Sequence, residues 1–317
     1  MNVAANGLEG QRLWNASRGE VLLTTDFDYK GIKTCNAVAL VPTSFRRLQE
    51  TSRFLRSPKG LNLKAFDFVA ADRLARNYLL DNDNAVRTME LAFNDHAVGL
   101  VVVIHNVELV LPKRFKSRTE EKDFHKERML KFARKVMRKH PGSRVLPVYV
   151  EISEDGKMLI YKSFEELLHG GNEEIIWHAE FAFRDVARCE FLVLMCLDFR
   201  FRRETFDMLR ASYKLPYFHL VGTAGSCQGL IGQDPTVIKS VRQAIERGAC
   251  RAIIVNHQGC AAYKRQTGGM NDLQEREFHE QQIELGSEIL TSMGIVETQG
   301  VYAQLIGDGT RMQFVAA

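Results

Sequence analysis

Short apolar runs alternate along the chain with longer stretches in which apolar residues recur at helical spacing. In the first half, strand-like runs occupy 21–25, 65–70, 98–104 and 145–153, with a helix-length stretch at 84–96 and a long charged one before 145. In the second half, strand-like runs at 190–195, 217–222, 251–255 and 296–306 alternate with helix-length stretches at 235–248 and 271–293. Continuous apolar strands separated by helices are typical of parallel α/β proteins.

The second half repeats the order of the first. An ungapped overlay pairs Phe66 with Phe218, Val103 with Val255 and His105 with His257. After a shift of two residues, "EKDFH" (121–125) overlies "EREFH" (275–279). We therefore predict an internal duplication, with one repeat over 1–170 and the second over 171–317.

Composition and charge place the chain among globular proteins. Of its 317 residues 45% are hydrophobic, which is enough for a sizeable core, and the net charge is only +4. Basic residues crowd the stretch 111–144, but acidic residues are interleaved through its first part. This mixture favours a solvated helix face over a nucleic-acid surface, so no nucleic-acid partner is predicted.

The cysteines and the N-terminal residues indicate the compartment. Six cysteines are spread over the chain without the spacing of a small secreted domain, which favours a reducing environment. The first residues resemble neither a signal peptide nor an import presequence, and no apolar run approaches the ~18 residues of a membrane span. We therefore expect a cytoplasmic location and no membrane partner.

Two groups of candidate metal ligands follow two of the strand-like runs. Cys196, Asp198 and Arg200 follow the run at 190–195 at alternate positions, and His257 and Cys260 follow the run at 251–255. Taken singly, such a cysteine is more often a core residue, and such a histidine often caps a backbone group. Open α/β sheets, however, bind ligands at the carboxyl ends of their strands. Two thiolates and one imidazole with a fourth position open are typical of a catalytic zinc site.

The combination of Cys-x-Asp-x-Arg with a later His-x-x-Cys resembles the β-class carbonic anhydrases. The resemblance runs from about Cys189 to the end of the chain and includes a strand that enters an Ala-Gly turn ("VGTAGS"). It implies two tandem β-carbonic-anhydrase-like repeats, each with a mostly parallel central sheet flanked by helices, that form a pseudo-dimer. It also implies that Cys196, His257 and Cys260 bind zinc and that Asp198 and Arg200 are the catalytic pair beside it.

The function implied is that of a carbonic anhydrase, a lyase that hydrates carbon dioxide reversibly to bicarbonate. Zinc-bound hydroxide would be the nucleophile, and Asp198, kept ionised by Arg200, would orient it. In the family, the equivalent aspartate can instead bind the metal and close the site. His219 or a buffer molecule is a candidate carrier of the released proton. Carbon dioxide and bicarbonate are the expected small-molecule partners, and the chain can also form a homo-oligomer of pseudo-dimers.

The chain departs from the family's pattern in two places. Ala261 and Ala262 follow the second cysteine where the family usually has glycine, and the turn reads "GTAGS" (222–226) in place of Arg-Asn-Ala-Gly. An added methyl group can narrow the pocket, or strain the backbone if the position needs a positive φ. Carbonyl sulfide and carbon disulfide, on which related folds act, are therefore alternative substrates.

The first repeat lacks both thiolates. In the overlay of "LLTTDFDYKG" on "LMCLDFRFRR", Thr24 replaces Cys196, Asp26 matches Asp198, and Asp28 replaces Arg200. In "IHNVE", His105 is kept and Glu108 replaces Cys260. We expect a structural partner that walls the pocket of the second repeat, since the family's active site lies at a dimer interface. A harder metal on Asp26, Asp28, His105 and Glu108 is the alternative.

Other classes of function remain open. A zinc-bearing but non-catalytic subunit or sensor would contain zinc without hydrating carbon dioxide. A nucleotide-binding protein is weakly suggested by "GTAGSCQGLIG", which fits neither G-x-G-x-x-G nor the P-loop pattern. A purified protein without stoichiometric metal under reducing conditions would exclude the metal site.

Overall fold

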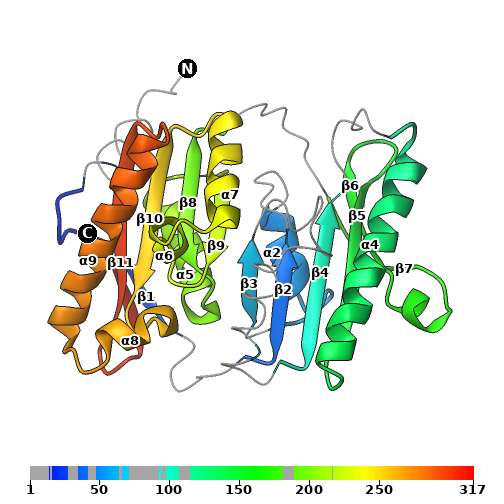
Figure 1. Cartoon of the computed structure of the whole chain (residues 1–317), viewed down its shortest axis with the longest axis horizontal. Coiled ribbons are helices and arrows are strands. Elements are labelled where there is room, and N and C mark those ends of the chain that lie inside the picture. Colours follow the sequence, from blue (N-terminus) through cyan, green and yellow to red (C-terminus); the bar gives the residue numbers. More distant parts are fainter. Residues whose placement is uncertain are drawn as a thin grey trace. The chain divides into compact units, whose positions relative to one another are not determined.

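The fold is that of an α/β protein with mixed sheets flanked by helices (Figure 1). The computed structural model describes residues 14, 16–27, 35–41, 48–63, 66–70, 93, 98–106, 115–180, 189–215 and 217–317. The chain forms two compact units, each described by itself below. Unit 1 comprises Met1–Lys33 and Ala187–Ala317, and unit 2 comprises Thr34–Val186. The α/β fold class predicted from the sequence is confirmed.

Unit 1 has a sheet in the order β1-β12-β11-β10-β8-β9. Its parallel strands are β8 (Phe191–Cys196), β9 (His219–Thr223), β10 (Arg251–His257) and β11 (Glu297–Ile306). Antiparallel strands β12 (Arg311–Ala316) and β1 (Val21–Asp26) complete the edge beside β11. Its described helical segments are α5 (Phe199–Ala211), α6 (Gln228–Ile231), α7 (Pro235–Glu246), η3 (Ala261–Tyr263), α8 (Lys264–Thr267) and α9 (Asp272–Ser292).

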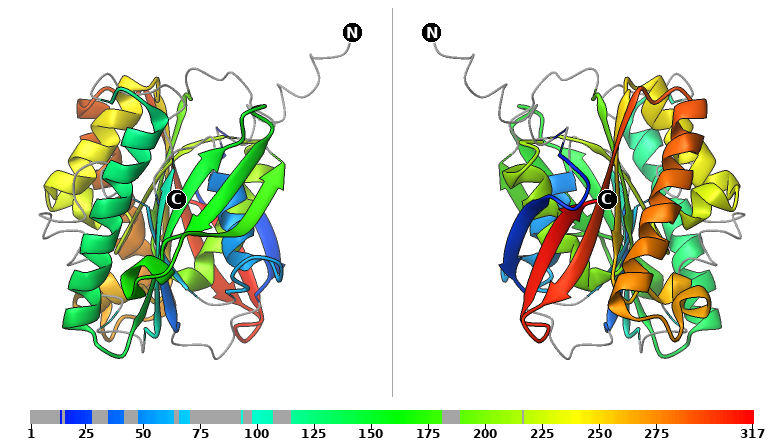
Figure 2. Two further views of the ribbon diagram at one scale, coloured as in Figure 1. Left: turned by 90° about the vertical axis from the view of Figure 1, so that its right-hand side faces the viewer. Right: turned by 90° about the vertical axis from the view of Figure 1, so that its left-hand side faces the viewer.

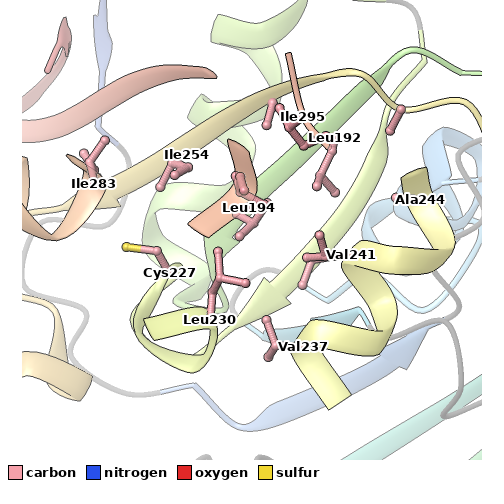
Figure 3. Close-up of a cluster of buried hydrophobic side chains, with 14 residues drawn as sticks. Leu192, Leu194, Cys227, Leu230, Val237, Val241, Ala244, Ile254, Ile283 and Ile295 are labelled. Atoms are coloured by element: carbon pink, nitrogen blue, oxygen red, sulfur yellow. The ribbon is translucent and has the colours of Figure 1, made fainter. Parts of the chain in front are cut away.

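A core of branched aliphatic side chains joins the helices to the sheet of unit 1. Leu194 from β8 and Ile254 from β10 face Val241 from α7 and Ile283 from α9 (Figure 3), and Leu194 and Ile254 are fully buried. Helix α7 begins sharply because Asp234 caps its free backbone N–H groups and Pro235 occupies its first turn. Burial of these apolar side chains fixes the helices against the sheet and so positions the strand ends.

Helix α9 approaches α6 closely at Gly286. A Cβ atom at this position would lie 2.9 Å from Cβ of Cys227 and 3.2 Å from Cδ1 of Ile254. We predict that Gly286→Ala destabilises the protein. Overpacking costs about 1–3 kcal/mol, which exceeds the gain of at most about 1 kcal/mol in helix propensity. A lower midpoint of urea denaturation would show the effect. Gly142→Ala, whose Cβ would meet nothing within 4 Å, is the matched control and should leave the midpoint unchanged.

Unit 2 has a sheet in the order β3-β2-β4-β5-β6-β7. Its parallel strands are β2 (Ala37–Val41), β3 (Asp67–Ala70), β4 (Leu100–Asn106) and β5 (Arg144–Ile152). Antiparallel strands β6 (Met158–Ser163) and β7 (Glu174–Glu180) follow beside β5. Its described helical segments are α2 (Leu48–Arg56), α4 (Arg118–Lys139) and η2 (Glu166–His169). Of the helix expected at 84–96, only Phe93 lies among the described residues.

The two sheets have the same strand order and orientation. Reading β9-β8-β10-β11-β12-β1 against β3-β2-β4-β5-β6-β7 matches each parallel and antiparallel pair. The edge strands differ in their origin along the chain: β7 directly follows β6, whereas β1 comes from the opposite end of the sequence to β12 (Figure 2). A division at 170 would place β1–β6 in the first repeat and β7–β12 in the second. In the structure, however, β1 belongs to unit 1 together with β8–β12, and β7 belongs to unit 2 together with β2–β6.

This topology corrects the overlay of the first repeat. Thr24 and Asp26 lie on β1, an antiparallel edge strand, whereas the strand in the position of β8 is β2. The overlay is wrong because it matches the run at 21–25 with β8, whereas the strand in that position is the run at 37–41. The burial of the two strands distinguishes them: every residue of β2 is buried, and β1 is mostly half-exposed. Asp28 and Glu108 lie outside the described residues.

No helix in the described part of the chain is both long enough and apolar enough to span a membrane.

Candidate metal centre

Two neighbouring parallel strands deliver the predicted ligands to one edge of the unit 1 sheet. Met195 on β8 pairs with Val255 on β10, so Cys196 and His257 lie at the same end of the sheet. The chain then turns through Gly259, at φ +67°, and brings Cys260 back toward the strand ends. Glycine adopts this left-handed conformation without the steric cost that a side chain would add. The turn therefore allows histidine and cysteine three positions apart to face one point.

Cys196, His257 and Cys260 form one compact, buried group. Their ligand atoms all lie within 4.8 Å of one another, and the two Sγ atoms are 3.7 Å apart. The residues are 7%, 2% and 3% exposed, respectively. This is the one group of three or more potential ligands within the residues that the structure describes. Two sulfurs and one imidazole in this arrangement can bind a metal ion such as zinc.

The imidazole of His257 is oriented for metal binding. Nδ1 lies 2.9 Å from the carbonyl oxygen of Gln258, which can only accept, so Nδ1 carries the proton and donates it. Nε2 is then left with its lone pair. This atom is buried without a hydrogen-bond partner, and burying an unpaired polar atom costs folding free energy unless another group binds it. A metal ion bound to Nε2 would satisfy it, and the ring is held in place by Phe201, stacked 4.1 Å away between centroids.

The charges of the group also favour a cation. The neighbouring Cys260 thiol and burial raise the pKa of the Cys196 thiol well above its usual value. A divalent cation between the sulfurs would offset both effects, because it stabilises the two thiolates. Burial lowers the pKa of His257, but its interactions with Cys196, Asp198 and the Gln258 backbone raise that pKa overall. The carboxylate of Asp198 favours a positive charge at this position.

Asp198 and Arg200 form an ion pair beside the group. Asp198 caps α5 by accepting from the backbone N–H of Arg200 at 3.0 Å, and the Arg200 guanidinium donates to both carboxylate oxygens, at 2.6 Å from Nη2 to Oδ2. Burial raises the pKa of Asp198, but the hydrogen bonds and the charge of Arg200 help to lower it by more, so the pKa lies below its ordinary value. Oδ2 lies 3.9 Å from Nε2 of His257, yet Asp198 is not part of the compact ligand group.

The two alanines after Cys260 fit without strain. Ala261 is exposed and is not among the residues with positive φ, so its methyl group does not distort the backbone. The Ala262 methyl packs against the cluster of Cys196, Cys260 and Tyr263, facing Gly225 of the "GTAGS" turn. There, Gly225 and Ser226 both have positive φ, and Ser226 Oγ donates to the Leu194 carbonyl oxygen at 3.2 Å. The unusual residues therefore shape a packed turn.

His219 lies far from the ligands. It pairs with Leu192 at the start of β8, whereas Thr223 pairs with Cys196 at the end of that strand. Four residues of extended chain separate the two positions by about 13 Å. The suggestion that His219 carries a proton from the site is not supported by this placement.

The corresponding histidine of unit 2 has a different neighbourhood. His105 on β4 is buried and stacks on His125 of α4, with ring centroids 3.7 Å apart. No group that includes His105 or Asp26 is among the potential metal ligands in the described part of the chain. The harder metal proposed for the first repeat therefore gains no support there.

The basic stretch around α4 is balanced by acids. A cavity of about 370 Å³ on unit 2 is lined by cationic side chains of α4 and β6. The ion pairs there are Arg118 with Glu121, Lys126 with Asp123, and Lys122 and Lys162 with both Glu151 and Glu173. Because each of these cations has an acidic partner, the cavity does not indicate a binding site for a polyanion.

Two residues of the site were not expected from the sequence. Glu275 accepts a hydrogen bond from the backbone N–H of Gly259 at 2.7 Å, and the side chain of Gln258 bonds to both Asp272 and the backbone of Leu305. The recurrent "EREFH" contains Glu275, but the recurrence indicates only a duplication. Neither residue type indicates by itself that it holds a loop.

No protein-family model and no curated protein matches the chain. The assignment of function therefore depends on the residues and geometry of the site.

Proposed function

We propose that the protein is a zinc-dependent carbonic anhydrase that hydrates carbon dioxide reversibly to bicarbonate. The observation that carries the proposal is the buried Cys196–His257–Cys260 group with the Asp198–Arg200 ion pair beside it. A zinc ion held by these ligands would supply Lewis-acid activation of water near neutral pH, because coordination lowers the pKa of water to about 7.

Asp198 would orient the attacking water. Its carboxylate is held ionised by Arg200, so it can accept a hydrogen bond from the water and thereby fix the direction of the lone pair that attacks carbon. Arg200 donates to both oxygens of Asp198 and so holds the carboxylate in its ion pair beside the ligand group. Cys196, His257 and Cys260 would therefore be the residues that hold the metal, and Asp198 would remain available to a water molecule.

Apolar side chains would keep bulk water from the reacting carbon. Phe201 covers one face of His257, and Tyr263 packs with the two thiols. Carbon dioxide carries no charge that a polar group could bind, so an apolar surface that excludes water suits it better than a polar pocket. The same apolar surface would suit carbonyl sulfide or carbon disulfide, which are the alternative substrates.

The proposal includes the architecture of two tandem β-carbonic-anhydrase-like repeats that form a pseudo-dimer, with repeats at 1–170 and 171–317. The identical strand order of the two sheets supports a duplication. The second repeat would hold the zinc, and the first would act as a non-catalytic partner. A cytoplasmic protein without nucleic-acid or membrane partners completes the proposal.

A combined metal analysis and stopped-flow assay tests the function. We expect the purified full chain, prepared under reducing conditions, to hold one zinc ion and to hydrate carbon dioxide far faster than buffer alone. Removal of the zinc by a chelator should abolish the activity, and adding zinc back should restore it. Protein that holds no stoichiometric metal would refute the proposal.

The second candidate is a zinc-bearing subunit or sensor without catalysis. The residues that favour it are Ala261 and Ala262, since they replace the usual glycine beside the second cysteine. Zinc content without hydration of carbon dioxide across a wide pH range would favour this function.

The alternative substrates need a separate measurement. The same stopped-flow assay with carbonyl sulfide in place of carbon dioxide would distinguish them.

A further inference from the structure

The peptide group between Gln258 and Gly259 is hydrogen-bonded on both sides. Its carbonyl oxygen accepts from Nδ1 of His257 at 2.9 Å, and its N–H donates to Oε1 of Glu275 at 2.7 Å. One rigid peptide plane therefore joins a carboxylate on α9 to a metal-facing imidazole. Hydrogen bonds in such a chain polarise one another, so the carboxylate makes the carbonyl a stronger acceptor.

The side chain of Gln258 fixes this peptide from two further directions. Its Nε2 donates to Oδ1 of Asp272 at 3.0 Å, and its Oε1 accepts from the backbone N–H of Leu305 at 2.9 Å. The backbone N–H of Gln258 also donates to the carbonyl oxygen of Ala303 at 2.9 Å. The turn between His257 and Cys260 is thus held by both α9 and β11.

Glu275 is itself held in position. Its neighbour one helical turn along α9 is His279, which is fully buried and packs edge-on against Tyr263. Interaction with His279 and the hydrogen bond from Gly259 lower the pKa of Glu275, although partial burial opposes them. The group is therefore a carboxylate near neutral pH and carries a negative charge one peptide away from the ligand.

We propose that Glu275 is a positioning residue for the metal centre, which acts through the Gln258–Gly259 peptide to orient His257 and strengthen it as a ligand. Metal-bound histidines commonly donate their second N–H to a carboxylate or a carbonyl, which fixes the ring and increases its basicity. Here a carbonyl and a carboxylate act in series. The inference rests on the zinc-binding part of the proposed function and is independent of the reaction.

Unit 2 offers an internal comparison. Glu121 holds the corresponding position on α4 and is fully buried, but an Arg118 guanidinium donates to it at 2.6 Å. Arg118 therefore pairs with that carboxylate, whereas Glu275 accepts from the backbone N–H of Gly259 and lies beside His279. The hydrogen bond from Gly259 to Glu275 lies in the unit that holds the thiols.

The test is the zinc dissociation constant, measured by competition with a chromophoric chelator. We expect Glu275→Ala to bind zinc about ten- to a hundredfold more weakly than the wild type, the range typical of outer-shell partners. Glu275→Gln keeps an oxygen that can accept from Gly259 but loses the charge, so its affinity should fall by less than about tenfold. Nitrogen NMR of the His257 imidazole should show a weaker Nδ1 hydrogen bond in both variants, most in Glu275→Ala.

Glu288→Ala, at an exposed position of α9, is the matched control and should bind zinc like the wild type. Thermal unfolding of the zinc-free variants checks that the fold is kept, and Glu275→Gln carries the test if Glu275→Ala does not fold. Equal zinc affinities in the wild type and both Glu275 variants would overturn this inference but leave the proposed function intact. Absence of zinc binding by the wild type would overturn both.

Discussion

Replacing Cys260 by serine is expected to remove zinc binding and carbon dioxide hydration together. A serine hydroxyl stays protonated near neutral pH and is a poor ligand for zinc, so one of the three ligands is lost. The loss of affinity should exceed about 100-fold, the upper end of the effect of an outer-shell partner. Zinc content after gel filtration and the stopped-flow rate measure the two effects on the same preparation.

The control for this substitution is Cys250→Ser. Cys250 is a half-buried free cysteine directly before β10, and it is not part of the ligand group. It should therefore keep its zinc and its activity. Full retention of zinc by Cys260→Ser, measured beside this control, would refute the ligand assignment.

Replacing Asp198 by asparagine is expected to separate metal binding from catalysis. Asparagine is among the best helix N-caps, so α5 should still begin at Phe199, and the three proposed metal ligands are untouched. The amide carries no charge and holds the water less firmly, so the hydration rate should fall by about 100-fold or more. Zinc content should remain that of the wild type.

Asp234→Asn provides the comparison for Asp198→Asn, because Asp234 caps α7 in the same way. We expect this variant to keep both zinc and activity. An Asp198→Asn variant that hydrates carbon dioxide at the wild-type rate would show that the carboxylate takes no part in the reaction.

The sequence predicted the parallel strands of unit 1 because they are largely apolar runs. β8 and β10 are almost wholly buried, and burial on both faces leaves few polar residues to interrupt the pattern. The antiparallel strands β6, β7 and β12 were not predicted, because exposed and buried residues alternate in them or their runs are short. β2 is fully buried, but its run is only five residues long, and a short run such as β1 does not reveal which strands it pairs with.

The candidate ligands could be predicted because parallel strands bring their carboxyl ends to one edge. The prediction that Cys196 and His257 lie together needs only β8 and β10 as neighbouring strands, and the alternation of strands and helices suggests this. The role inferred for Glu275 could not be predicted in this way. It depends on a hydrogen bond from the backbone N–H of Gly259 to Glu275, and the direction of a backbone N–H is a property of the folded turn.

The pairing of β1 with β12 determines how late in translation the sheet of unit 1 can be completed. β1 is synthesised before every other strand described, yet its partner β12 is the last of them, so β1 lacks this partner strand until Arg311–Ala316 has been made. Two strands so distant in sequence pair slowly, because the chain loses conformational entropy on closing the loop before the contact forms. During translation the backbone N–H and C=O groups of Val21–Asp26 therefore lack their partner strand. The polar residues at its end, Thr24, Thr25 and Asp26, make association with other nascent chains less favourable.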